Sequence, residues 1–303
     1  MIKKQGRFAD NNMLPHTIFI IRKIALGDVL WVEPVIRQLS LKYKKVVFKT
    51  EFASLFKNYP LTNVSFVDSF SVYHKIMYKI HRYYNWRSKY IELDKAYEQN
   101  PRMHILHAYQ GKANLPATIE YPKLYLKDSD SEVPVPAGKF IILHLETTSM
   151  RNFRNVYGVE WNTIIQYITD KGLEVIQLGI YPQQVKGARY IKTDLHGMTK
   201  LIDHCDLFIG IDSGPSHIAA ALGKRCLIFF GSVNPWYRHF KALFNGTIMQ
   251  SYCEFQHCYH EVTSTNGITC RLVGDEGKPI CCIHNTVDVI ENIGNLLDRK
   301  ISL

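Results

Sequence analysis

The sequence predicts an α/β fold built from two halves, and three observations support this. Short apolar runs of strand length alternate with longer amphipathic stretches along most of the chain. A polar, proline-containing stretch near the middle divides these segments into two series. The 303 residues, 46% of them hydrophobic, suffice for two domains of medium size, each with a core of its own.

The first series begins with an apolar run over residues 16–22, which predicts a strand. We expect residues 25–28 to form the turn after it, and a helix to follow to about Tyr43. Pro34 would lie either in the first turn of that helix or at a kink within it. Further strands are expected over residues 46–49, 64–67 and 90–94.

The stretch over residues 128–138 lacks helical periodicity and has the composition of a linker. We therefore divide the chain into an N-terminal domain, residues 1–132, and a C-terminal domain, residues 133–303. The second series supplies strands over residues 140–145, 174–179, 207–211 and 226–231, and helices over residues 161–170, 199–205 and 287–297. The result is two Rossmann-like halves with parallel sheets and a cleft between them.

The stretch over residues 206–223 has the pattern of a buried strand, a polar turn and a short helix. Ser213 can cap that helix, Pro215 suits its first turn, and Gly223 can end it. The start of such a helix offers free backbone N–H groups and the positive end of the helix dipole, which together favour a phosphate. Because Pro215 has no N–H group, the donors would be the amides of Ser213, Gly214, Ser216 and His217. Asp212, Ser216 and His217 add side chains around this predicted nucleotide-diphosphate site.

The chain carries 37 Lys and Arg against 27 Asp and Glu, a net charge of +10. This excess favours an anionic partner, such as a nucleotide, a nucleic acid or an acidic membrane surface, although a basic solvated surface explains it equally well. Residues 73–87 interleave aromatic and basic side chains, which suits nucleic acid or a membrane surface. We favour the alternative of an amphipathic helix that packs Ile76, Met77, Ile80 and Tyr84 against the core.

No apolar run reaches the length of a membrane span, and the basic residues 1–7 lack the apolar core of a signal peptide. We therefore expect a cytoplasmic protein, with peripheral contact to the inner face of the membrane as an option.

Without a signal peptide, the late cysteines point to a metal site more than to disulfides. Four thiolates could hold zinc or iron tetrahedrally, and the candidate ligands are Cys253, Cys258, Cys270 and Cys282, with Cys281 beside the last. Free thiols are an equally good interpretation.

Two parts of the sequence resemble a known family. Residues 19–37 look like the N-terminal signature of glycosyltransferase family 9, which includes the ADP-heptose:lipopolysaccharide heptosyltransferases. Residues 206–223 and 229–235 are similar to its C-terminal nucleotide-binding signature. The resemblance implies a GT-B fold over nearly the whole chain. It also implies an inverting sugar transfer from a nucleotide-diphosphate sugar, without a cofactor in catalysis.

The resemblance assigns roles to residues of this sequence. Asp28 matches the proposed catalytic base of the family, whereas its plain structural role would be to cap the following helix. Asp212 and His217 match positions that contact the donor; the alternative for His217 is a surface residue of the first helical turn. Thr147 and Thr148 can bind phosphate, and the basic residue expected after them is Arg154 or, less favoured, Arg151. That these arginines are simply charged residues of a solvent-exposed loop is almost as good an explanation.

The sequence also departs from the family in two places. An acidic residue that often follows the strand ending at Gly179 is missing, and Gln183 or Gln184 stands there at best. Residues 93–109 differ from the acceptor region of the lipopolysaccharide enzymes. We expect transfer of a heptose or related sugar, with ADP-heptose favoured, to a surface glycan such as lipopolysaccharide. The alternatives are the same chemistry on a protein or a modified DNA base, and a non-catalytic scaffold that binds nucleotide sugars.

Overall fold

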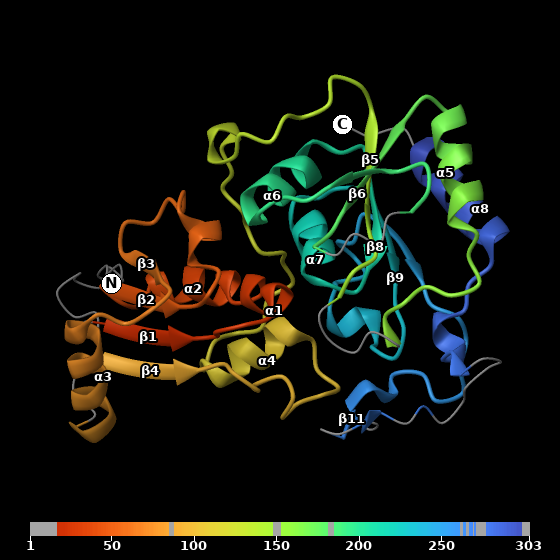
Figure 1. Cartoon of the computed structure of the whole chain (residues 1–303). Helices are drawn as coiled ribbons and strands as arrows, with labels where there is room; N and C mark the ends of the chain where they lie inside the picture. Colours follow the sequence, from red (N-terminus) through yellow and green to blue (C-terminus); the bar gives the residue numbers. More distant parts are fainter. Residues whose placement is uncertain are drawn as a thin grey trace, which may run out of the picture.

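The computed structural model describes residues 17–84, 88–147, 153–180, 185–260, 263–264, 267–268, 270 and 277–298. Its two main sheets are parallel, and helices lie against them (Figure 1). The first sheet takes its strands from residues 17–92 and the second from residues 140–249. The prediction of an α/β fold with two parallel sheets is therefore confirmed.

The first sheet has the strand order β3-β2-β1-β4, so its first strand in the chain lies at the centre. Ile18 and Ile20 point to the face that α2 covers, whereas Phe19 and Ile21 point to the face of α3, where Met77 packs on them. This alternation follows from the period of two along a strand. The elements are β1 (Thr17–Ile21), α1 (Leu26–Leu30), α2 (Glu33–Ser40), β2 (Lys45–Lys49), β3 (Val64–Val67), α3 (Val72–Tyr84), β4 (Ser88–Glu92) and α4 (Ile105–Lys112).

The second sheet has the order β10-β9-β8-β5-β6-β7. Its helices α5 and α8 cover one face, and α6 and α7 cover the face turned towards the first sheet (Figure 1). The elements are β5 (Phe140–His144), α5 (Trp161–Asp170), β6 (Glu174–Leu178), β7 (Arg189–Ile191), α6 (Leu195–His204), β8 (Leu207–Ile211), α7 (Gly214–Ala221), β9 (Cys226–Phe229), β10 (Gly246–Met249) and α8 (Thr286–Asp298). A two-stranded antiparallel sheet, β11 (Thr263–Ser264) and β12 (Gly267–Ile268), lies apart from it.

The largest apolar cluster is shared by the two halves. It runs from Ile20 and Val35 of the first half to Ile202 and Ile218 on α6 and α7. Trp31, which is almost fully buried, stands where the halves meet. Its ring contacts aromatic and histidine side chains from both, namely His104, Tyr121, His217 and Phe240.

The helix expected to reach about Tyr43 is in fact two helices, α1 and α2. Trp31 and Val32 separate them, and Pro34 lies in the first turn of α2, where its missing N–H costs no helical hydrogen bond. Residues 26–28 already belong to α1, so the expectation of a turn over residues 25–28 was wrong. The helix expected from residue 199 starts at Leu195, because the carboxylate of Asp194 accepts from the Gly197 amide at 2.8 Å and caps it.

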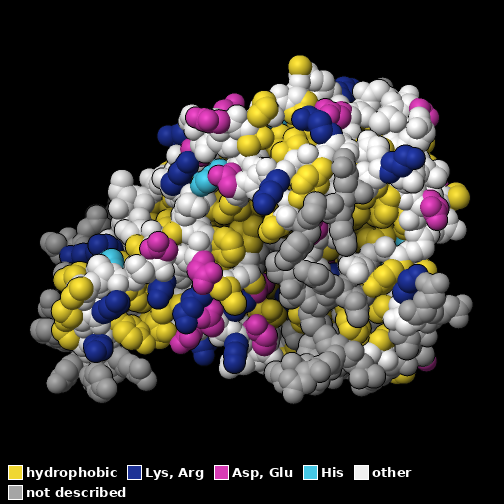
Figure 2. Space-filling view, viewed as in Figure 1, with side chains coloured by type: hydrophobic (Ala, Val, Ile, Leu, Met, Phe, Trp, Pro, Cys, Tyr) yellow, Lys and Arg dark blue, Asp and Glu magenta, His cyan; other side chains and the backbone are white. Residues whose placement is uncertain are grey.

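Helix α3 exists, but its expected packing is only partly right. Met77 packs against β1, whereas Ile76 is 51% exposed. Val72 and Tyr73 are also exposed, and basic side chains accompany them on this helix. Figure 2 shows apolar and basic side chains side by side over the region of α3, at the left edge of the view. The side chain of Tyr84 lies outside the described residues.

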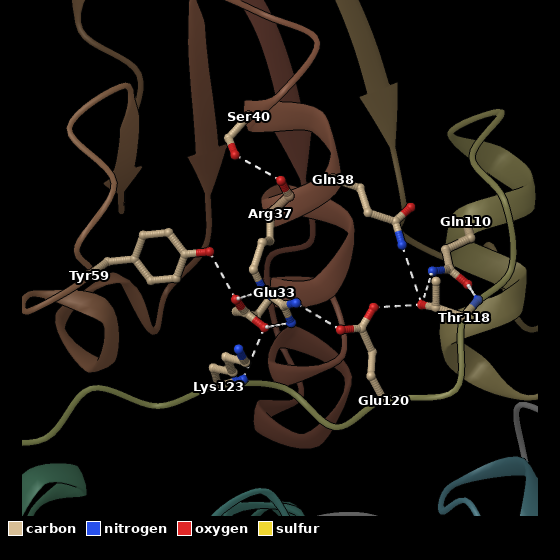
Figure 3. Close-up of polar contacts among 9 residues, drawn as sticks. All are labelled: Glu33, Arg37, Gln38, Ser40, Tyr59, Gln110, Thr118, Glu120 and Lys123. Carbon is tan, nitrogen blue, oxygen red and sulfur yellow. Dashed lines mark hydrogen bonds and ion pairs between the residues drawn. The ribbon is translucent and has the colours of Figure 1, made fainter.

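A buried polar network fixes the chain where it leaves the first half (Figure 3). Glu33, fully buried on α2, accepts from Nε and Nη2 of Arg37, each at 3.1 Å, and from the Tyr59 hydroxyl at 2.8 Å. It also accepts from the Lys123 amide at 2.9 Å. Arg37 donates in addition to Glu120 at 2.7 Å. Residues 120–123 are thereby held against α2, which places Tyr121 beside Trp31.

Candidate active site between the two sheets

A cavity of about 520 Å³ lies between the two halves, a size suited to a nucleotide-sized ligand. The first half contributes Ala25 and the start of α1, including Asp28, together with Phe52 and Tyr97. The second half contributes the carboxyl ends of β5, β6 and β8 and the start of α7. Because carboxyl ends of parallel strands collect loops at one edge, side chains far apart in the sequence meet here.

Asp28 lines this cavity from the first turn of α1. Its Oδ2 atom forms an ion pair with Arg22, the residue that follows β1. Asp28 makes no capping hydrogen bond to the helix, so the capping role that we considered for it was wrong. Arg22 is 5% exposed and also faces Asp94 at 3.7 Å. Burial opposes its charge, but Tyr109 and Asp28 raise the pKa of Arg22 above its usual value.

The polar turn after β8 starts α7 as predicted, but its hydrogen bonds are largely internal. Ser216 accepts from the Ser213 amide at 3.2 Å and donates to the Ser213 carbonyl at 2.7 Å. The amides of Ser216 and His217 both donate to that carbonyl. Ser216 is fully buried and does not line the cavity, so it shapes the turn. Asp212, Ser213, Gly214, Pro215 and His217 do line it.

Two glycines allow α1 and α7 to pack closely at this point. A Cβ atom on Gly27 would lie 2.4 Å from Cδ2 of His217, and one on Gly214 would lie 2.8 Å from Cβ of Leu26. Such distances do not occur between real side chains, so both positions need glycine. The close approach brings the Asp28-bearing helix onto the predicted phosphate-binding helix.

His217 is buried, so the alternative of a surface residue was wrong. The indole N–H of Trp31 donates to Nδ1 of His217 at 3.2 Å, across the boundary between the halves. Since Nδ1 accepts, a neutral His217 carries its proton on Nε2, which lies 3.8 Å from Oδ1 of Asp212. Burial and the nearby Arg238 and Arg154 lower the pKa of His217 to about 3. The ring is therefore neutral near pH 7.

Arg154 and Asp212, which the resemblance assigns to the donor site, lie next to each other. The guanidinium of Arg154 lies 3.5 Å from Oδ2 of Asp212, and both side chains line the cavity. Thr147 lines it as well. Thr148 and Arg151 lie outside the described residues, as do Gln183 and Gln184.

Several residues that line the cavity were not predicted from the sequence, among them Glu146, Tyr97 and Arg238. Glu146 follows β5 and accepts from the Ile180 amide at 2.6 Å, so a carboxylate does stand at the end of β6, although it comes from another strand. Tyr97 reaches the cavity from the first half, and Arg238 reaches it from the loop after β9. No local pattern singles them out. The only signal for Glu146 was its place directly after a predicted strand.

The late cysteines gather in one place. Cys253, Cys281 and Cys282 pack together, and the sulfurs of the last two are 4.0 Å apart. Burial and the neighbouring thiols of Cys281, Cys270 and Cys253 raise the pKa of Cys258, so all these groups are close to one another. Thiols in such a group suit zinc or iron. Within the described ranges, however, no three Cys, His, Asp or Glu side chains stand ready to hold a metal ion.

Comparison with known proteins agrees with this architecture. Residues 160–266 match the model of glycosyltransferase family 9 (heptosyltransferase). A segment of 41 residues is 49% identical to lipopolysaccharide heptosyltransferase 3 of Escherichia coli, over 12% of this chain and 12% of that enzyme. The aligned part is thus a small fraction of that relative.

Solved structures resemble the chain over most of its length. The iron-containing dodecameric glycosyltransferase TibC of enterotoxigenic E. coli has a TM-score of 0.72 at 15% identity, covering 92% of this chain and 78% of that one. E. coli ADP-heptose lipopolysaccharide heptosyltransferase II has a TM-score of 0.61 at 14% identity, covering 93% and 98%. A complex of TibC with ADP-D-β-D-heptose has a TM-score of 0.67 at 14% identity, covering 94% and 76%.

These likenesses show the GT-B fold of the heptosyltransferases, with the cavity between its two sheets. The family match over residues 160–266 includes the C-terminal signature of the sequence resemblance, whereas the N-terminal signature at residues 19–37 lies outside it. Residues 160–266 are therefore similar to glycosyltransferase family 9, the heptosyltransferase family.

Proposed function

We propose that this protein is an inverting glycosyltransferase. It would move a heptose or related sugar from a nucleotide-diphosphate sugar, with ADP-heptose favoured, to a hydroxyl group of a surface glycan such as lipopolysaccharide. One observation carries the proposal: Asp28 and the start of α7 line the same cavity, from opposite halves of the molecule. The family match and the solved complex of a similar protein with ADP-heptose support it.

The chemistry needs a base and a site for the leaving group. The acceptor hydroxyl gives its proton to Asp28, and its oxygen attacks the anomeric carbon from the side opposite the diphosphate. The bond from that carbon to the phosphate oxygen breaks with its electron pair, and the nucleoside diphosphate leaves. Arg22 holds Oδ2 of Asp28, which orients Oδ1 for the proton. We propose that this transfer needs no cofactor.

The donor would bind along the second half. We assign this role to Thr147, Thr148, Arg154, Asp212, Ser213, Gly214, Pro215 and His217, with Ser216 acting through the shape of the turn. The start of α7 and Arg154 supply positive potential for the diphosphate. Glu146 supplies a carboxylate that suits the hydroxyl groups of a ribose or sugar. We propose that the acceptor domain ends at residue 132 and that the donor domain begins at residue 133.

Replacing Asp28 with Asn tests the proposal, because an amide takes up no proton at neutral pH. We expect kcat to fall by about 10²- to 10⁴-fold, with ADP affinity retained. The measurement is ADP release during heptose transfer from ADP-heptose to a heptose-deficient lipopolysaccharide core. Asp68→Asn, an exposed change in the same half, is the matched control. Near-normal turnover by a folded Asp28→Asn variant would contradict the role of Asp28. Activity absent from the wild type with every nucleotide sugar tried would favour a non-catalytic scaffold.

We also propose that the cysteine segment binds a structural zinc or iron ion through Cys253, Cys258, Cys270 and Cys282. The gathered thiols support this, as does the iron content of the similar TibC structure. The ion would tie the loop over residues 253–282 together and take no part in the transfer. We expect about one zinc or iron per chain by elemental analysis, and a fall in melting temperature after removal with a chelator. Protein that is folded and active with neither metal would refute this assignment.

A lipopolysaccharide acceptor would place the protein at a membrane surface. Among the residues that the structure describes, no helix is long and apolar enough to cross a membrane. We propose a cytoplasmic protein that contacts the inner face peripherally, through the exposed Val72, Tyr73 and Ile76 of α3 and the adjacent Lys75 and Lys79. Co-sedimentation with anionic but not neutral vesicles is expected. Equal binding of duplex DNA at physiological salt would instead favour the nucleic-acid alternative.

A further inference from the structure

Arg238 is an unusual side chain for its position. It follows the 3₁₀ turn Pro235–Tyr237, is 4% exposed, and still lines the cavity between the halves. Its guanidinium lies over the ring of Tyr97, 4.5 Å from the ring centre. An arginine is rarely buried without a carboxylate, because the loss of hydration must be compensated.

The other two arginines near the proposed base and Asp212 each have a carboxylate partner. Arg22 forms its ion pair with Asp28, and Arg154 lies 3.5 Å from Asp212. In the described part of the chain, no carboxylate lies within ion-pair distance of Arg238. The ring of Tyr97 offsets part of the desolvation through a cation–π contact. Arg238 is thus the arginine of this cavity that keeps its charge without a carboxylate in contact.

The surroundings of Arg238 fix where that charge acts. Asp28 and Asp212 are near enough to raise the pKa of Arg238, although burial opposes its charge, and Arg238 in turn lowers the pKa of His217. Arg238, Asp28 and Asp212 also line the same cavity, so the guanidinium acts on the space that the proposed base on α1 shares with the start of α7. In a transfer with inversion, the bond from the anomeric carbon to the phosphate oxygen breaks in this space, between the base and the site of the leaving group.

We propose that Arg238 binds the phosphate group of the donor that is attached to the sugar and leaves with the nucleotide. This inference rests on the proposed function, and it names a contact that the sequence resemblance did not assign. A planar guanidinium can donate two parallel hydrogen bonds to phosphate oxygens. As the sugar–oxygen bond breaks, negative charge grows on that phosphate, and a fixed, buried cation stabilises it without rearrangement. The contact with Tyr97 holds the guanidinium in place before the donor arrives.

Comparing ADP with AMP tests the contact, because AMP lacks the second phosphate. We expect Arg238→Gln to weaken ADP binding by about ten- to a hundred-fold in calorimetric titration and to leave AMP binding unchanged. Arg238→Lys keeps the charge but not the two-pronged donor, so its ADP affinity should fall between those of the wild type and the glutamine variant. The lysine variant also serves if glutamine prevents folding. Arg189→Gln, an exposed arginine on β7, is the matched control.

Kinetic measurements distinguish this phosphate contact from recognition of the acceptor or a purely structural role of Arg238. We expect kcat of Arg238→Lys to fall while the KM for the acceptor stays unchanged. Unchanged ADP affinity with a raised acceptor KM would show that Arg238 recognises an anion of the acceptor, and would overturn the proposal. A lower melting temperature with ADP affinity unchanged would show a purely structural arginine, and would overturn it too. If the wild type binds none of ADP, GDP and UDP, the proposed function itself fails; equal ADP binding by wild type and variant refutes only the role of Arg238.

Discussion

Gly27 shows how a single residue constrains this site. The sequence drew attention to it only as the residue before Asp28, whereas the structure shows that it admits the ring of His217. That ring in turn accepts the hydrogen bond from Trp31 of the other half. The absence of a side chain at residue 27 is therefore what allows the two halves to meet at the cavity.

Gly27→Ala should push α1 away from α7, because the new methyl group overlaps the ring of His217. We expect unfolding free energy to fall by about 1–3 kcal/mol and transfer activity to fall more than ten-fold. Denaturant titration and the transfer assay measure both effects. Gly111→Ala in α4 is the matched control, since nothing lies within 4 Å of its new Cβ and alanine favours helices. Equal stability and activity of the two variants would contradict the packing argument.

At the scale of the elements, periodicity predicted most strands and several helices well. α5 has the predicted bounds, and β1, β2, β3, β6 and β9 lie within a residue or two of theirs. These segments carry strong patterns that local physics enforces. The break between α1 and α2 was missed, because Trp31 and Val32 are both buried and continue the apolar pattern of the helices. β7 and β10 were missed because they are short and only partly buried.

The attachment of residues 120–123 to α2 was not predicted from the sequence. Glu33, Arg37 and Glu120 belong to no recognisable sequence motif. Their ion pairs nevertheless anchor the chain on α2 (Figure 3). Burial opposes the charge of Glu120, but hydrogen bonds from Thr118 and Arg37 lower its pKa below the usual value. Such a network forms only after the helices have packed.

At the scale of the molecule, the shared core buries neutral histidines. Burial lowers the pKa of His104 to about 2 and those of His144 and His284 to about 4, in addition to that of His217. In the unfolded chain these groups bind protons near pH 6.5, so the unfolded state takes up more protons below that pH. Their contribution to stability is complete above pH 6.5 and is lost as the pH falls towards the folded values.

We therefore expect the unfolding free energy to be constant above about pH 7 and to fall steeply between pH 6.5 and 5. Each of these histidines contributes up to about 1.4 kcal/mol per pH unit. Urea titrations at pH 7.5, 6.0 and 5.0 measure the slope. His144→Leu should reduce it, whereas His204→Gln, at an exposed position, should leave it unchanged. A slope that is flat over this range would show that the histidines are protonated in the folded protein.

The sequence by itself determined the α/β fold, the strand, turn and helix of the proposed phosphate site, and the candidacy of Asp28. These follow from the period of apolar residues and from hydrogen bonds within a few residues, which a local pattern records. Only the tertiary structure decided that Tyr97, Glu146 and Arg238 join them at one cavity, and that Arg22 pairs with Asp28. Their convergence depends on the packing of α1 against α7, and that packing arises from contacts between residues nearly two hundred positions apart.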